Sequence, residues 1–76
     1  MERVIVHSTD LASVGYDEAT NTLEVQSVGR KGAPGPVYQY TNVPRGIWVE
    51  LLRSHSKGEF FASAIKGKYP TSKVAV

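Results

Sequence analysis

The sequence contains no cysteine, which excludes disulfide bridges and thiolate metal sites. It has only two histidines, His7 and His55, which lie far apart along the chain without a supporting cluster of His or Asp, so no metal site is predicted. No carboxylate pair has a spacing typical of acid–base catalysis, and no leader-like or membrane-spanning apolar run occurs. We therefore expect a cytoplasmic protein that is not an enzyme, needs no cofactor and has no membrane partner.

The length of 76 residues predicts one domain, residues 1–76, with a core near the lower size limit for folding unaided. A hydrophobic content of 41% and a charged content of 21% are typical of a folded domain rather than of a disordered chain. Because the core is small, a homo-oligomer is one expectation for this chain.

The charge is distributed unevenly, although the net charge is only +2. Residues 1–44 hold three bases against five acids, whereas residues 45–76 hold six bases against two acids. A phosphate-bearing partner would be attracted to the second half, or to Arg30 and Lys31 in the first. Such an excess of bases can equally serve solubility alone.

The first half of the chain has the period-two pattern that predicts strands. Apolar and polar residues alternate over residues 11–16 and 22–28, and the Asp, Asn and Thr residues between them predict a hairpin turn. Residues 29–36 hold three glycines and two prolines, which predict a long connection without a ladder. A third strand is predicted over residues 37–42. Short edge strands are candidates at the ends of the chain, over residues 4–6 and 74–76.

The period then changes to about 3.6, which predicts two short amphipathic helices. Pro44 suits a first helical turn with Asn42 as its cap, and Ser56 with Glu59 has the spacing of a capping box. The apolar stripes of the two helices are Ile47, Trp48, Leu51 and Leu52, then Phe60, Phe61, Ala64 and Ile65. The expected fold is therefore α+β, a three- to four-stranded antiparallel meander with two C-terminal helices packed on one face.

One combination of motifs spans residues 8–70 and consists of Ser8, Leu11, Ser13-Val14-Gly15-Tyr16-Asp17, Leu23-Glu24-Val25, Tyr38-x-Tyr40 with Val43-Pro44, Leu51-Leu52, Ser56-Lys57-Gly58, Phe61, Ile65 and Tyr69-Pro70. This combination resembles the KTSC domain, a family named for the C-terminus of some lysyl-tRNA synthetases and found also as short bacterial and phage proteins. The resemblance implies no established activity, only a suggestion of RNA binding. The sequence departs from the family's pattern in two places. Ser27 lies where the family usually has an aromatic residue, and residues 30–36 resemble an insertion within the 29–36 loop.

The two tyrosines of the Tyr-x-Tyr motif, Tyr38 and Tyr40, lie on one face of the third predicted strand. They could stack nucleotide bases, as aromatic residues do in single-strand binders. Because Gln39 and Thr41 occupy the opposite, polar face, we expect at least one tyrosine to pack beneath the helices, with a pocket wall as a further role. Trp48 is interpreted as a helix anchor.

Basic residues supply the other candidate contacts. A phosphate could bind at the second helix start through Lys57 and Gly58, although Glu59 there favours a structural cap. His55 is expected to cap the turn between the helices. The remaining candidates are Arg30, Lys31, Arg45, Lys66, Lys68 and Tyr69.

Three hypotheses follow for function. The first is a non-catalytic binding module for RNA or a small phosphate-bearing nucleotide. The second is an oligomer that sequesters a mono- or cyclic nucleotide signal, as in phage counter-defence. The third is a protein–protein adaptor without a nucleotide ligand.

Overall fold

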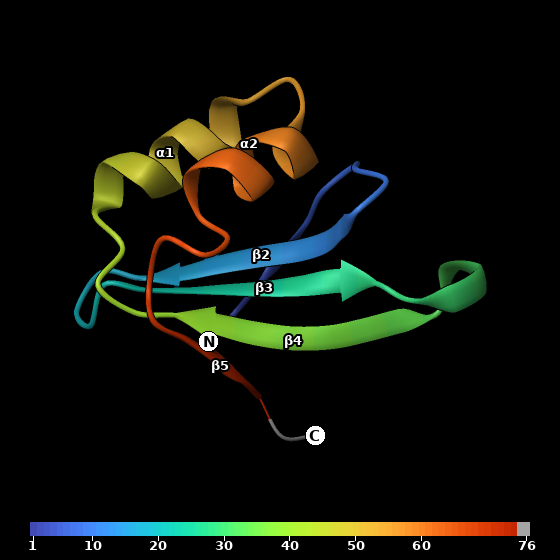
Figure 1. The fold of residues 1–76 in the computed structure, drawn as a ribbon, viewed down its shortest axis with the longest axis horizontal. Helices are drawn as coiled ribbons and strands as arrows, with labels where there is room; N and C mark the ends of the chain where they lie inside the picture. Colours follow the sequence, from blue (N-terminus) through green and yellow to red (C-terminus); the bar gives the residue numbers. More distant parts are fainter. Residues whose placement is uncertain (75–76) are drawn as a thin grey trace.

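The computed structural model describes residues 1–74, which form a five-stranded antiparallel sheet with two helices (Figure 1). The strands lie side by side in chain order, so the sheet is a meander. The α+β class is confirmed, but the expected three to four strands are too few, and the helices precede the last strand instead of following the whole sheet. In chain order the elements are β1 (Val4–Ile5), β2 (Leu11–Asp17), β3 (Thr22–Val28), a 3-10 turn (Arg30–Gly32), β4 (Pro34–Tyr40), α1 (Arg45–Arg53), α2 (Lys57–Ala64) and β5 (Thr71–Lys73).

The last strand lies earlier in the chain than the sequence pattern predicts. The chain turns back after α2 at Gly67, which has a φ of 76°. Pairing with β4 begins as soon as the turn ends, because the Thr41 N–H donates to the Pro70 carbonyl at 3.0 Å. Of the expected strand over residues 74–76, Val74 donates its N–H to the Val37 carbonyl, and residues 75–76 lie outside the described part.

The connection before β4 is shorter than the Gly/Pro content predicts. The 3-10 turn occupies only Arg30–Gly32, and β4 already begins at Pro34, opposite Val28. This first part of β4 extends beyond β5, whose pairing starts at Tyr38. Among residues 1–74, no strand is paired with this part of β4 on that side, so the missing N–H groups of its prolines cost no ladder hydrogen bond there. Figure 1 shows the resulting hairpin projecting beyond the helices, with the 3-10 turn at its tip.

The core lies between the sheet and the helices, which both cover the same face (Figure 1). Alternation along the central strands points Val14, Leu23, Val25 and Tyr40 to this face, where Leu51 of α1 is fully buried. Leu11 joins them because an irregularity between Leu11 and Ser13 reverses the alternation in β2. The stripe expected on α1 is only partly right, since Leu52 is exposed.

Both helix starts differ from the expected caps. The cap of α1 is Pro44 itself, without a side-chain hydrogen bond, and Asn42 instead adopts a positive φ of 61° in the turn before it. Ser56 does cap α2 by position, but its hydroxyl makes no capping hydrogen bond. The turn between the helices is held by Ser54, whose Oγ accepts the Ser56 N–H, so the expected capping role of exposed His55 is wrong.

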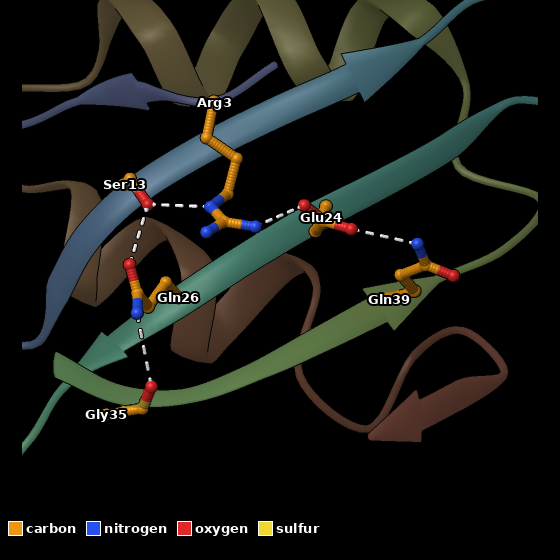
Figure 2. Close-up of polar contacts among 6 residues, drawn as sticks. All are labelled: Arg3, Ser13, Glu24, Gln26, Gly35 and Gln39. Atoms are coloured by element: carbon orange, nitrogen blue, oxygen red, sulfur yellow. Dashed lines mark hydrogen bonds and ion pairs between the residues drawn. The ribbon is translucent and has the colours of Figure 1, made fainter. Parts of the chain in front are cut away.

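The opposite face of the sheet carries a polar network. Arg3 donates to the Ser13 hydroxyl at 2.9 Å and pairs with the Glu24 carboxylate, which also accepts a 2.9 Å hydrogen bond from Gln39. Figure 2 shows how this network joins the N-terminal segment to three strands through Arg3, Ser13, Glu24, Gln26, Gly35 and Gln39. Burial would raise the pKa of the Glu24 carboxyl, but the hydrogen bonds from Gln39 and Arg3 and the charge of Arg3 outweigh it, so the pKa is lowered.

Candidate functional site

A groove of about 530 Å³ lies where β4 and β5 meet the end of α2, and it brings together part of the expected site. Tyr38, Tyr40 and Lys66 line it, as the sequence analysis proposed for a ligand site. The other lining residues come from five different segments and were not predicted as site residues: Ser27, Pro36, Phe61, Gly67 and Thr71. Of the described residues, no Asp or Glu lines this groove.

The two tyrosines have different roles in the groove. Tyr40 is only 4% exposed and its ring meets Phe61 edge to face, with 5.5 Å between the ring centroids. Burial, with a smaller effect from Tyr38, raises the pKa of the Tyr40 hydroxyl above its ordinary value. Tyr38 is half-buried and packs at the margin of the core. Tyr40 thus forms the floor of the groove, and Tyr38 provides the accessible aromatic surface.

Two lysines flank the aromatic surface. Lys66 lies just after α2, where its N–H donates to the Phe61 carbonyl at 2.9 Å, and its side chain is exposed. Lys73 of β5 pairs directly opposite Tyr38, so the two side chains share one face of the sheet. Sequence reasoning missed Lys73 as a site residue because the strand was placed three residues too late. The turn at Gly67 followed by Pro70 was the available signal.

Comparison with known proteins identifies the family. A model of the KTSC domain matches residues 7–69, which is most of the chain. The chain is a KTSC domain. It is 35% identical to a KTSC domain protein of Yersinia pestis whose crystal structure superposes with a TM-score of 0.86, each chain being covered to 97%. It is also 33% identical over 69 residues to an uncharacterized protein of Stutzerimonas stutzeri strain A1501, covering 91% of this chain and 90% of that protein.

The start of α2 in this KTSC domain is already occupied by a carboxylate. Asp10 lies so close to Gly58 that a Cβ on Gly58 would be 2.7 Å from its Oδ2 atom. Lys57 turns back and donates from Nζ to the Ser54 carbonyl at 3.1 Å. An anionic ligand would be repelled by Asp10 here. Gly58 therefore serves close packing, and Lys57 fastens the turn.

The two histidines lie apart in the sequence but line one hollow beside the start of α2. His7 and His55 share this hollow with Asp10, Lys57 and Glu59. Even so, within residues 1–74 no group of three or more His, Cys, Asp or Glu side chains is arranged to hold a metal ion. In the same part of the chain, no helix is both long and apolar enough to cross a membrane.

The remaining candidate residues lie away from the groove lining. Arg45 pairs with Glu18, and Arg30 and Lys31 lie exposed at the 3-10 turn. Lys68 is exposed after α2, whereas Tyr69 packs against the core. The candidate cations thus lie on several surfaces, and among those named from the sequence Lys66 is the one that lines the groove with the tyrosines.

Trp48 packs on a second aromatic residue far from the groove. Its ring stacks on Tyr16, with 5.7 Å between the centroids and 12° between the planes. The Tyr16 hydroxyl donates to the Val43 carbonyl at 2.5 Å. These contacts support the interpretation of Trp48 as a helix anchor.

Proposed function

We propose that this KTSC domain is a non-catalytic binding module for a nucleotide-type ligand, either RNA or a small phosphate-bearing nucleotide. The observation that carries the proposal is the composition of the groove, which Tyr38 and Lys66 line together with no Asp or Glu among the described lining residues. Aromatic rings and cations without a competing acid suit a ligand that has both a flat base and a phosphate.

The proposed binding mode assigns one part of the ligand to each side of the groove. A base stacks on Tyr38, an interaction worth about 1–3 kcal/mol per base. A phosphate attached to it lies between Lys66 and Lys73, which flank that ring. Tyr40 does not touch the phosphate, because its ring is held in the core by Phe61.

Binding to a panel of mononucleotides, cyclic nucleotides and short single-stranded RNAs tests this function, with calorimetry as the measurement. Tyr38→Ala and Lys66→Ala should each weaken the binding of the responding ligand about tenfold, which corresponds to about 1.4 kcal/mol. Lys31→Ala is the matched control, since it also removes one exposed cation but lies at the hairpin tip. An equal loss in all three variants would argue for nonspecific attraction and against the groove.

The same measurements separate the ligand classes. RNA that touches several phosphates should bind more weakly as salt rises, with a slope that grows with the number of contacts, whereas a mononucleotide should respond only slightly. Native mass spectrometry of protein purified from cells adds a second readout, because a retained nucleotide would appear as a mass increment. A protein that binds neither RNA nor any nucleotide in the panel would contradict the proposal and favour the adaptor hypothesis.

A further inference from the structure

The two edges of the sheet differ in how they are protected against pairing. Edge strands present unpaired backbone groups, and proteins usually guard them with charged residues, prolines or bulges. At one edge, β5 is polar and carries Lys73. At the other edge, β1 consists of Val4 and Ile5, which are 53% and 85% exposed. The neighbouring charge does not guard this edge, because Arg3 turns onto the sheet to bind Glu24.

The backbone of Ile5 has free hydrogen-bonding groups on the open side. Ile5 lies opposite Ser13, and the next residue, Val6, donates its N–H to the Ala12 carbonyl at 3.2 Å. In an antiparallel ladder, residues whose backbone N–H and C=O bond to the neighbouring strand alternate with residues whose backbone N–H and C=O point away from it. Since Val6 bonds to β2, the N–H and C=O of Ile5 point away from β2. No strand of the described chain, residues 1–74, lies beyond β1.

Apolar side chains extend this edge into a patch. Ile5 lines a hollow of about 460 Å³ on the face of the sheet opposite the helices, together with Met1, Val28 and Pro34. Met1 and Val28 are themselves exposed. A standard interface takes about a tenth of a small protein's surface per partner, or about 500 Å² of the 5101 Å² here. The patch of large apolar side chains around Ile5 provides a starting area for such an interface.

We propose that this edge is the site of self-association, in which β1 pairs antiparallel with β1 of a second copy about a two-fold axis at Ile5. The two Ile5 residues then exchange two N–H to C=O hydrogen bonds, and the sheets join into one sheet of twice the size. The edge is complementary to itself because one residue supplies both a free donor and a free acceptor, as a two-fold axis requires. The proposed nucleotide groove lies at the opposite edge, so this inference does not depend on it.

Sedimentation equilibrium of the whole chain from micromolar to millimolar concentration tests the inference. The wild-type mass should rise with concentration from 8.3 kDa toward twice that value. Ile5→Lys should weaken self-association about tenfold or more, because it places two like charges side by side at the axis. Ile5→Pro should also weaken it, since it removes an outward N–H that makes no bond to β2.

The matched control is Ser72→Lys, which adds the same charge to the exposed opposite edge and should leave the dimer intact. Thermal unfolding verifies that the Ile5 variants stay folded, as expected for a side chain that is 85% exposed. A chain that stays monomeric to millimolar concentration would overturn the inference. So would Ile5 variants that associate like the wild type, or a Ser72→Lys variant that loses the dimer. A monomeric chain that instead pairs this edge with another protein's strand would also overturn it.

Discussion

The guanidinium of Arg3 reaches across the face of the sheet and pairs with the carboxylate of Glu24 on β3 (Figure 2). Glu24 is only 6% exposed and its second oxygen accepts a hydrogen bond from Gln39. A buried carboxylate is stable when it is paired and hydrogen-bonded in this way. The pair therefore holds the N-terminal segment, which includes β1, against the rest of the sheet.

The lowered pKa of Glu24 makes part of the stability depend on pH. Its carboxylate is favoured in the folded state, so its contribution is fully present above the unfolded pKa of about 4.5 and is lost as the pH falls through the lower, folded value. Glu24→Gln should cost about 1–3 kcal/mol at pH 7. Urea unfolding at pH 7 and near pH 3 measures this, and the gap between wild type and variant should narrow at the lower pH. A gap that is the same at both values would contradict this assignment.

Gly15 should not tolerate a side chain. A Cβ at Gly15 would lie 2.4 Å from the Glu2 carbonyl oxygen, which is backbone and must move. Gly15→Ala should therefore displace the segment that carries Arg3 and destabilise the fold by about 1–3 kcal/mol. Gly46→Ala in α1 is the matched control, because no atom beyond its chain neighbours and its own helix backbone lies within 4 Å of the added Cβ. That change should stabilise the protein by up to about 1 kcal/mol. Chemical denaturation compares the two, and a Gly15→Ala variant as stable as the wild type would refute the close approach.

The effect of a Gly58→Ala substitution on stability should depend on whether Asp10 is present. Gly58→Ala should destabilise the wild type because its Cβ meets the Asp10 carboxylate at 2.7 Å. In an Asp10→Ala background the same change should become neutral or favourable, by up to about 1 kcal/mol, since alanine is the better helix former. A double-mutant cycle of unfolding free energies measures the coupling. Additive effects would show that Asp10 does not restrict this position.

The hydroxyl of Tyr16 should contribute to stability mainly through a partly buried hydrogen bond, with Asn21 Oδ1 as a second, exposed partner at 3.2 Å. It donates to the Val43 carbonyl while its ring stacks on Trp48. Tyr16→Phe keeps the stacked ring and should cost about 1 kcal/mol. Tyr16→Leu also removes the stacking and should cost more. Equal losses in the two variants would indicate that stacking adds nothing beyond burial. Thermal unfolding monitored by Trp48 fluorescence follows both.

The predictions made from the sequence succeeded where a long pattern repeats. Apolar and polar residues alternate several times over residues 11–16 and 22–28, and the observed bounds of β2 and β3 agree closely with these ranges. The candidate edge strand over residues 4–6 is confirmed as β1. The prediction failed at β5, which begins three residues before the strand expected over residues 74–76. Such short strands have no pattern of their own and form only because a neighbouring strand offers its free backbone groups.

The site shows the same limit. Tyr38, Tyr40 and Lys66 could be singled out from the sequence by residue type alone, and they line one groove. Two features of the site could not be deduced from the sequence. The position of Lys73 opposite Tyr38 depends on strand register. The position of Lys57 away from the groove depends on the packing of α2, where Gly58 lies against Asp10.

The sequence by itself determined the α+β class, the two central strands, the two helices and the apolar face that joins them, because these follow from the periodicity of side chains along a single segment. Only the tertiary structure decided which cations lie beside the tyrosines, which sheet edge is left unguarded and where Arg3 binds. These features depend on distances between segments far apart in the chain, and no local pattern records such distances. Arg3 and Glu24, for example, are separated by 21 positions and come into contact only when the sheet has formed.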